Sequence, residues 1–293
     1  MSDSHRRFLI EGTPVRGGWV RLDQTYREVL ARHDYPPILR RMLGELLAAT
    51  ALLASNLKFR GSIVVQLQST GPLQLLVVEC TDDRGMRAIA KWNGGLDDAG
   101  EDIDLQQLAP GGRCVITLDP RDSSQMYQGI VALEKGSIAE LLEHHMQNSE
   151  QLATRLWLAA DGERAAGMLL QKLPTDDDAA DALDDDWARV TLLGSTVRPV
   201  ELLSLDAQSL LQKLFAGEDV RLFKPHPVRF SCACSEARVA NALLLIGQEE
   251  VEAVLAEQGQ IEVACEFCNR KYSFDRAGAL GLFAQPEPAP TVH

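Results

Sequence analysis

Four cysteines near the C-terminal end of the chain constrain its fold more than any other feature of the sequence. Cys232 and Cys234 form a close pair with one residue between them, and Cys265 and Cys268 form a second pair with two residues between them. Zn²⁺ takes four thiolates in closed structural sites, and each close pair can supply two ligands from one turn. The alternative is two unrelated pairs of free or disulfide-bonded cysteines. We predict one Zn²⁺ per chain in the reduced protein, held by all four thiolates.

The residues around the second pair alternate in polarity over residues 260–264 and 271–274, which predicts a hairpin with Cys265 and Cys268 on its turn. Two short helices are expected between the two cysteine pairs. A segment of this size builds only a weak core, and bound zinc contributes roughly 10–16 kcal/mol to the folding of small zinc domains. We therefore predict a zinc-binding domain over residues 229–293, which includes a C-terminal tail.

Charge and the N-terminal sequence narrow the class of protein. The 293 residues carry a formal net charge of −13, which argues against general binding to nucleic acid or anionic membranes, because phosphate contacts need clustered Lys and Arg. The first residues contain no apolar core of signal-peptide length, and the most apolar stretch, residues 46–57, is too short to span a bilayer. We expect a cytoplasmic protein with no specific nucleic-acid or membrane partner. In that compartment cysteine clusters more often serve metal or redox chemistry than structural disulfides.

Residues 1–174 are predicted to form an α+β domain. A long helix is expected to begin at Pro36 and Pro37 and to run to about Leu57, and its second half has almost no polar face, which places it in the core. Most other segments alternate as strands joined by turns, which indicates a mostly antiparallel sheet covered on one face. The expected strands include residues 62–68, 73–80, 86–92, 114–118, 125–133, 152–159 and 165–173.

An acidic segment follows this domain. Residues 175–186 contain seven aspartates and no basic residue, so the segment repels itself and is predicted to be a linker. Residues 187–228 contain candidate helices that are too short to be stable alone and need a surface on which to lie. We therefore expect three parts: the α+β domain (1–174), the acidic linker with a metastable helical segment (175–228) and the zinc-binding domain (229–293).

Other candidate residues receive structural roles. Cys80 and Cys114 lie in expected strands and are predicted to be inert and buried. His144 and His145 are expected to form a solvated pair, or a favourable charge, near the end of a helix, and His226 is a weak competitor as a zinc ligand. The sequence has no G-x-S-x-G elbow, no Walker loop and no G-x-G-x-x-G after a strand, so we predict that the protein is not an enzyme.

The chemistry of the sequence therefore lies in its cysteine cluster. Zinc keeps its ligands deprotonated, and the thiolate is the form that is oxidised. Oxidation of either close pair would remove two ligands, expel the metal and unfold a domain that depends on it. Two alternatives remain: a constitutive zinc-ribbon module that binds nucleic acid or a protein partner, slightly favoured by Arg270 and Lys271, and a thiol–disulfide oxidoreductase. The net charge weighs against the first, and a Cys-x-x-Cys that leads into a strand rather than a helix weighs against the second.

The cysteine pattern resembles the zinc motif of the 33 kDa chaperonin family, the redox-regulated heat-shock holdases. The resemblance includes Cys232-x-Cys234, Cys265-x-x-Cys268 and the aromatic residues Tyr272 and Phe274 that follow. It extends to segments along nearly the whole chain, which are Phe59-Arg60-Gly61, Gly71-Pro72-Leu73, Gly167 to Pro174, Val228-Arg229-Phe230 and Leu243 to Gly247. The Asp-rich residues 175–186 are a departure from the family pattern.

This resemblance implies a cytosolic chaperone that is inactive when reduced and zinc-bound. Oxidation is then expected to form the disulfides Cys232–Cys234 and Cys265–Cys268, release zinc, unfold the linker and expose a surface that binds unfolding client proteins. The resemblance also implies a homodimer on activation. We expect the second pair to oxidise first, because Arg270 and Lys271 favour its thiolates. The apolar residues of the helical segment that are expected to contact clients are Trp187, Leu192, Leu202, Leu211 and Phe215.

Overall fold

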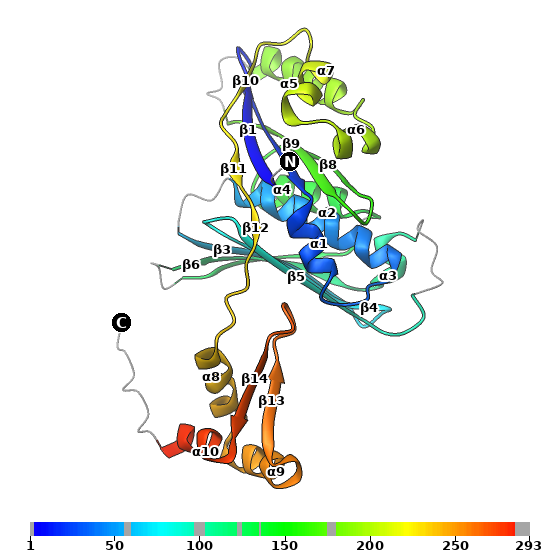
Figure 1. Cartoon of the computed structure of the whole chain (residues 1–293). Helices are drawn as coiled ribbons and strands as arrows, with labels where there is room; N and C mark the ends of the chain where they lie inside the picture. Colours follow the sequence, from blue (N-terminus) through cyan, green and yellow to red (C-terminus); the bar gives the residue numbers. More distant parts are fainter. Residues whose placement is uncertain are drawn as a thin grey trace. The chain divides into compact units, whose positions relative to one another are not determined.

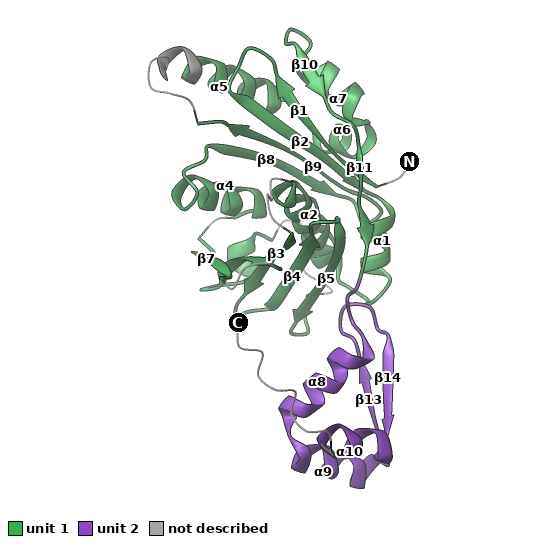
Figure 2. Cartoon of the chain, turned by 90° about the vertical axis from the view of Figure 1, so that its left-hand side faces the viewer, with its two compact units in different colours: residues 1–231 green, residues 232–293 purple. Residues whose placement is uncertain are grey.

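The chain folds into two compact units, residues 1–231 and residues 232–293 (Figures 1 and 2). The computed structural model describes residues 3–55, 60–96, 103–121, 125–134, 136–174 and 180–284. We call the two parts unit 1 and unit 2. No helix among these residues is both long enough and apolar enough to cross a membrane.

Unit 1 contains two six-stranded sheets, which we call sheet A and sheet B. Sheet A has the order β10-β1-β2-β9-β8, and β11 also pairs with β1; every pairing is antiparallel. Its strands are β1 (Ser4–Ile10), β2 (Val15–Leu22), β8 (Thr154–Ala160), β9 (Ala165–Lys172), β10 (Val220–Leu222) and β11 (His226–Pro227).

Sheet B has the order β12-β5-β4-β3-β6-β7. It is antiparallel except for β12, which pairs with β5 in parallel. Its strands are β3 (Gly61–Gln68), β4 (Leu73–Thr81), β5 (Gly85–Trp92), β6 (Arg113–Pro120), β7 (Tyr127–Ala132) and β12 (Arg229–Phe230). The predicted α+β class with mostly antiparallel strands is confirmed.

The long helix α2 (Pro37–Ala54) lies between the two sheets (Figure 1) and contacts strands of both. Proline at its first position suits the start of a helix, because its ring sets a helical φ and its missing N–H would have no partner there. The helix is buried on almost every side, as its lack of a polar face predicts. The arrangement differs from the single half-covered sheet that we expected, because α2 has enough apolar surface to bury a sheet on each side.

The apolar side chains between the sheets form what we call the inner core. Its largest members come from α2, from α1 (Gln24–Leu30), from the segment between these helices and from the strands on either side. They include Leu22, Tyr26, Tyr35, Ile38, Leu39, Leu43, Leu46, Leu47, Leu52, Val65, Leu67, Leu76 and Val78. α3 (Leu105–Leu108) and α4 (Ile138–Asn148) add further side chains at its margin.

α4 corrects one expectation. Ser137 caps the helix as predicted, since its hydroxyl accepts a hydrogen bond from the Glu140 N–H at 3.2 Å. His144 is exposed, but His145 is buried, so the prediction of a solvated histidine pair is wrong for His145. His145 lies four residues after Leu141, on the apolar face of the helix, and that face packs inward.

The opposite face of sheet A is covered by three helices, which we call the outer helices: α5 (Ala180–Gly194), α6 (Pro199–Ser204) and α7 (Ala207–Leu214). The sequence predicted that these helices need a surface, and sheet A provides it (Figure 1). The resulting outer core consists of Phe8, Ile10, Val15, Trp19, Ala159, Ala166, Met168, Leu170, Val190, Leu202, Leu203, Ala207, Leu210, Leu211, Leu214 and Phe215. Of the acidic run, residues 175–179 lie outside the described part of the chain, and the remainder belongs to α5.

A carboxylate joins two of the outer helices. Glu201 in α6 accepts a hydrogen bond from the Arg198 guanidinium at 2.7 Å and also binds the Lys213 ammonium in α7. The bond from Arg198, followed by the bond from Lys213, lowers the pKa of Glu201 to about 2. The ionised carboxylate therefore fastens α6 to α7 throughout the physiological pH range.

Residues 220–231 connect the outer helices to unit 2, and we call them the strap. β10 and β11 pair with β1 of sheet A, and β12 then crosses to β5 of sheet B. The Ser231 N–H donates a hydrogen bond of 2.8 Å to the Met86 carbonyl. Cys232 follows immediately, so the strap ends where the first cysteine pair begins.

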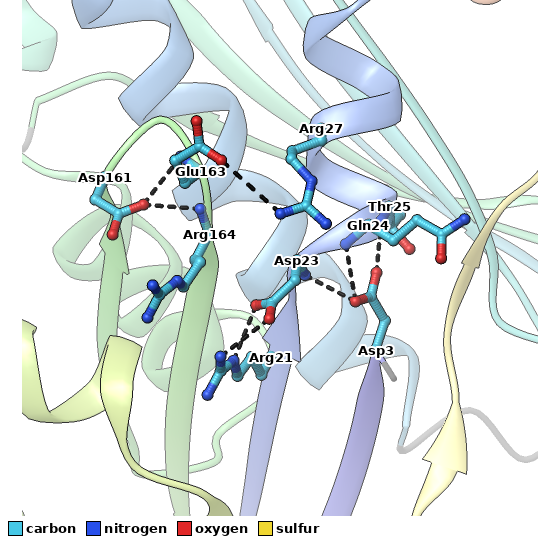
Figure 3. A network of polar contacts seen from close by, with 9 residues as sticks. All are labelled: Asp3, Arg21, Asp23, Gln24, Thr25, Arg27, Asp161, Glu163 and Arg164. Atoms are coloured by element: carbon cyan, nitrogen blue, oxygen red, sulfur yellow. Dashed lines mark hydrogen bonds and ion pairs between the residues drawn. The ribbon is translucent and has the colours of Figure 1, made fainter. Parts of the chain in front are cut away.

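A polar network fastens the N-terminal end of β1 to α1 (Figure 3). The buried Asp3 carboxylate accepts hydrogen bonds from the backbone N–H groups of Asp23, at 2.8 Å, Gln24, at 3.0 Å, and Thr25. These are free donors at a helix N-terminus, where a negative charge is favourable. Arg21 pairs with Asp23 at 2.9 Å. The N-terminal end of β1 is therefore fixed to α1 by charge-assisted bonds.

Unit 2 is small. Its elements are α8 (Glu236–Ile246), α9 (Gln248–Gln258), the hairpin β13 (Gln260–Ala264) and β14 (Lys271–Asp275), and α10 (Arg276–Ala284). Gly259 ends α9 in the left-handed conformation at φ 80°, which glycine adopts without steric cost. The described core of unit 2 consists of Leu243, Val251, Leu255, Ile261, Phe274 and Ala279.

Candidate metal centre

The four cysteine sulfurs of unit 2 converge. The Sγ atoms of Cys232, Cys234, Cys265 and Cys268 all lie within 4.8 Å of one another, and all four side chains are partly buried. Two of these separations join the two segments: Cys232 Sγ lies 3.7 Å from Cys265 Sγ, and Cys234 Sγ lies 3.3 Å from Cys268 Sγ. Two segments separated by 30 residues are thus brought to one point.

The hairpin turn between β13 and β14 presents the second pair, as predicted. The Cys265 N–H donates to the Arg270 carbonyl at 2.9 Å, and the Cys268 N–H donates to the Cys265 carbonyl at 3.3 Å. Asn269 completes the turn with φ 57°, a left-handed conformation that asparagine tolerates better than most residues.

The first pair precedes a helix. Ser235 caps α8 by accepting a hydrogen bond from the Arg238 N–H at 3.3 Å, so the helix starts directly after Cys234. The close spacing of Cys232 and Cys234, between the strap and this cap, leaves the segment little room to adjust.

A phenol contacts the cluster. The Tyr272 hydroxyl donates a hydrogen bond to Cys234 Sγ at 3.1 Å. Burial acts to raise the pKa of Cys234, but the hydrogen bonds from Tyr272 and the neighbouring thiols outweigh it and lower the pKa to about 7. Burial raises the pKa of Cys268 to about 12 and also raises the pKa of Cys265. The surroundings of the cluster therefore favour a thiolate at Cys234 and disfavour one at Cys265 and Cys268.

The charge of the four cysteine sulfurs indicates whether a metal ion suits the cluster. Four sulfurs at these distances become four thiolates only where a cation balances their charge, and a bound dication deprotonates coordinating thiols. A donor set of four sulfurs suits Zn²⁺ and other metals that prefer thiolates, and does not suit Mg²⁺ or Ca²⁺. The four cysteines can thus hold such a metal ion.

The other cysteines lie elsewhere. Cys80 and Cys114 are both fully buried in sheet B, and burial raises the pKa of each to about 12. Their predicted burial is confirmed. His226 is not part of the cluster: it lies in the strap, opposite His5 of β1.

The residues predicted to contact clients belong to the outer helices or directly follow α7. Leu202, Leu211 and Phe215 are buried in the outer core, and Trp187 is partly buried against it. Leu192 is 70% exposed.

Sequence reasoning did not identify two features. One is Tyr272 as a partner of Cys234; its place in the strand after the second cysteine pair was the only available signal. The other is the pairing of the strap with both sheets, because strands of two or three residues are too short to show an alternating pattern.

Comparisons with known proteins agree with these observations. The model of the family described as Hsp33 protein matches residues 3–275. The 33 kDa chaperonin of Methylobacillus flagellatus is 54% identical over 284 residues, which are 97% of this chain and 95% of that protein. The 33 kDa chaperonin of Chromobacterium violaceum is 49% identical over 96% of this chain and 94% of that protein. These relatives are named as chaperonins, not as enzymes.

A solved structure shares the fold. The crystal structure of the 33 kDa chaperonin from Thermotoga maritima superposes with a TM-score of 0.79 and covers 96% of this chain and 98% of that one, at 21% sequence identity. The family match, the identity along nearly the whole chain and the four converging cysteines lead to one conclusion. The chain is a member of the Hsp33 protein family.

Proposed function

We propose that this protein is a redox-regulated holdase chaperone of the cytoplasm, with one Zn²⁺ per chain in its inactive, reduced state. The observation that carries the proposal is the convergence of Cys232, Cys234, Cys265 and Cys268 from two distant segments. The names of its close relatives support chaperone activity. Clients are unfolding proteins, and the chain uses neither nucleic acid nor membranes as specific partners.

In the reduced state the four cysteines would hold the metal as thiolates, and a bound dication would supply the positive charge that favours their deprotonated form. Cys232 and Cys234 belong to one segment, and Cys265 and Cys268 to the other. The core of unit 2 is small, so most of its folding energy comes from this cluster.

Activation is an oxidation of two thiolates to a disulfide by a peroxide. One thiolate attacks a peroxide oxygen, which gives a sulfenic acid and hydroxide, and the second sulfur displaces the sulfenic hydroxyl to close the disulfide. Two electrons leave the protein for each disulfide. The oxidised cysteines can no longer hold the metal.

The pairing of the disulfides decides whether the protein responds. Bonds across the segments, Cys232–Cys265 and Cys234–Cys268, would keep the two segments together as the metal does. Bonds within the pairs, Cys232–Cys234 and Cys265–Cys268, would let the segments separate. We propose the second pairing, which the family resemblance implies and which would let the segments separate. Cys265–Cys268 is proposed to close first, although the lowered pKa of Cys234 in the metal-free cluster favours the other pair.

The strap transmits the loss of unit 2. Its pairings with β1 and β5 involve only two or three residues each, and the exposed ion pair of Arg229 with Asp83 adds little. Once the residues after Cys232 unfold, the C-terminal end of the strap is no longer attached to a folded unit. Short edge strands and short helices belong to the least stable part of a domain, so the strap and the outer helices open together.

The opened segment supplies the client-binding surface. Release of the outer helices exposes Trp187, Leu202, Leu211 and Phe215, which join the already exposed Leu192. It also uncovers the face of sheet A that carries Phe8, Trp19 and Met168. A newly exposed apolar surface of this kind binds unfolding chains and favours a homodimer. In this proposal residues 1–174 keep their fold, 175–228 open, and 229–293 release zinc.

The experiment measures zinc, activity and hydrogen exchange on one sample. We expect one zinc per reduced chain, no suppression of aggregation of a heat-denatured client enzyme, and protected amides in residues 187–228. Peroxide should release the zinc, start the suppression and remove this protection. Zinc-free reduced protein, or suppression that ignores oxidant, would contradict the proposal. Insulin reduction and mobility shift of DNA or RNA test the oxidoreductase and nucleic-acid alternatives.

A matched control separates the cluster from the other thiols. A Cys80→Ser, Cys114→Ser double variant should respond to peroxide like the parent, because both residues are buried and protonated. A Cys265→Ser, Cys268→Ser variant should lack the response. Loss of the response in the first variant, with the fold intact, would place the switch elsewhere.

A further inference from the structure

A pocket of about 430 Å³ opens between the sheets of unit 1 where α2 ends. Leu53, in the last turn of α2, lines it together with residues of both sheets. The lining residues are Arg16, Leu53, Ile63, Ile116, Leu118, Tyr127, His145, Met146, Glu150, Leu152, Gln171, Leu173 and Pro174.

Most of the wall is apolar. Ile63 of β3 and Ile116 of β6 form the side made by sheet B, and Met146 of α4 adjoins them. Leu53, Ile63 and Ile116 are less than a tenth exposed, so the wall is fixed by the inner core behind it. A preformed apolar cavity with few polar groups is the usual form of a small-molecule site, and this volume lies within the usual range of roughly 300–1,000 Å³.

The positively charged side chain of Arg16 lines one side of the pocket. The half-buried Arg16 guanidinium donates to the Gln171 amide oxygen, at 2.9 Å from Nε and also from Nη2. The Gln171 amide nitrogen donates to Thr154 Oγ1 at 3.0 Å, which fixes the orientation of the amide. Among the described residues, no carboxylate lies within ion-pair distance of Arg16, and Arg7 adds a second positive charge nearby. Arg16 is held in place by a neutral partner, and its guanidinium forms no ion pair with a carboxylate of the described residues.

A buried imidazole supplies a second polar group. His145 is 3% exposed, and its Nδ1 has no hydrogen-bond partner within the described structure. Its Nε2 lies 3.8 Å from the Glu150 carboxylate, which also accepts a hydrogen bond from the Tyr127 hydroxyl at 3.3 Å. Buried polar atoms are nearly always paired, so an unpaired one in the wall of a pocket indicates a missing partner.

We propose that this pocket binds an amphipathic monocarboxylate, with its aliphatic chain between the sheets and its carboxylate on Arg16. The apolar walls accept the chain. The guanidinium presents planar donors that match a carboxylate and would gain an ion-pair partner that it lacks among the described residues. The site lies wholly within unit 1 and shares no residue with the cysteine cluster, so the inference is independent of the proposed function.

Calorimetric titration of the reduced, full-length protein with decanoate, below its micelle concentration, tests the site. We expect saturable binding of one decanoate per chain. Decan-1-ol, which has the same chain without the charge, should bind at least about tenfold more weakly, the scale of one charge-assisted contact. Acetate, which lacks the chain, should show no binding.

Three variants locate the ligand. Arg16→Gln should weaken decanoate binding about tenfold or more and leave decan-1-ol binding unchanged. Met146→Trp, which fills the pocket, should weaken both. Arg113→Gln is the matched control, because Arg113 is an exposed arginine of β6 that bonds to Gln68 outside the pocket. Thermal unfolding of each variant confirms that it is folded.

Two results would overturn the proposal. One is the absence of saturable decanoate binding to the parent protein. The other is equal binding of decanoate and decan-1-ol that Arg16→Gln does not alter, which would assign the pocket to uncharged apolar groups such as client side chains.

Discussion

Different forces stabilise the folds of the two units of this protein. Unit 1 buries the inner core on one face of sheet A and the outer core on the other, so that apolar burial dominates its stability. Unit 2 buries only a few apolar side chains and leaves Leu245 89% and Ile246 59% exposed on α8. In the proposed function, the metal-bound cysteine cluster takes the place of a larger core. A chemical change at the four sulfurs would then unfold unit 2 and leave the centre of unit 1 intact.

A second contrast lies within unit 1. α2 is a helix of 18 residues buried on almost all sides, whereas α6 and α7 have six and eight residues and expose one face. Sheet A is covered by α2 on one face and by the outer helices on the other. α2 is part of the domain's core, whereas the outer helices are too short to be stable without the sheet on which they lie.

The largest expected effect is loss of the metal. Chelation of zinc, or the Cys265→Ser, Cys268→Ser variant, should cost unit 2 on the order of 10 kcal/mol and unfold it. Amides of residues 236–284 should lose hydrogen-exchange protection, while those of α2 keep it. If unit 2 keeps its protection after complete chelation, its apolar core is sufficient and the contrast between the units is wrong.

Deletion of one inner-core side chain tests the other unit. Leu46→Ala in α2 should destabilise unit 1 by about 2–5 kcal/mol, since Leu46 is fully buried. Denaturant unfolding measures this change, and zinc affinity should not alter. Leu245→Ala, at an exposed position, is the control and should change stability by no more than about 0.5 kcal/mol.

Truncation of a leucine in the outer core should destabilise the outer helices alone. Leu210 of α7 is also fully buried, but the outer helices can detach before unit 1 unfolds. Leu210→Ala should therefore lower the free energy of local opening by up to about 2 kcal/mol and leave global unfolding nearly unchanged. Hydrogen exchange in residues 199–214 would speed up, and the reduced variant should suppress some client aggregation without oxidant. An equal loss of protection in α2 would show that α2 and the outer helices form one cooperative unit.

Acid should weaken unit 1 through His5. Burial, followed by the charges of Arg84, His226 and Arg7, lowers the pKa of His5 to about 3. The unfolded chain binds a proton near pH 6.5 and the folded chain does not, so stability falls as pH drops from 6.5 towards 3. At pH 5 the loss is about 2 kcal/mol, at 1.36 kcal/mol per pH unit.

The variant His5→Gln isolates the contribution of His5 to the pH dependence of stability. Denaturant unfolding between pH 7.5 and 5 should show a shallower decline for His5→Gln than for the parent. Exposed His144 provides the control, and His144→Gln should leave the decline unchanged. A parallel decline for parent and His5→Gln would mean that His5 is protonated in the folded protein.

The smallest effect concerns the cluster itself. Tyr272→Phe removes the hydrogen bond to Cys234 Sγ, and a thiolate that loses a donor becomes a stronger nucleophile. Zinc release by peroxide should speed up roughly threefold to tenfold, the scale of one hydrogen bond. Tyr127→Phe in unit 1 is the control. An unchanged rate would mean that Tyr272 contributes to packing alone.

The sequence by itself determined the features that depend on local patterns. The spacing of the cysteines, the hairpin around Cys265 and Cys268, the all-apolar second half of α2 and the alternating strands of sheet B were all predicted, because each element is encoded by residues close together in the chain. The family resemblance rested on the same short motifs.

Only the tertiary structure decided how these elements combine. β2 pairs with β9 across about 150 residues, and no local pattern states that pairing or divides the strands into two sheets. The burial of His145, the contact of Tyr272 with Cys234 and the crossing of the strap from β1 to β5 depend on the same long-range packing. Sequence periodicity shows which face of an element is apolar, and the surface that covers this face is set by partners distant in the chain.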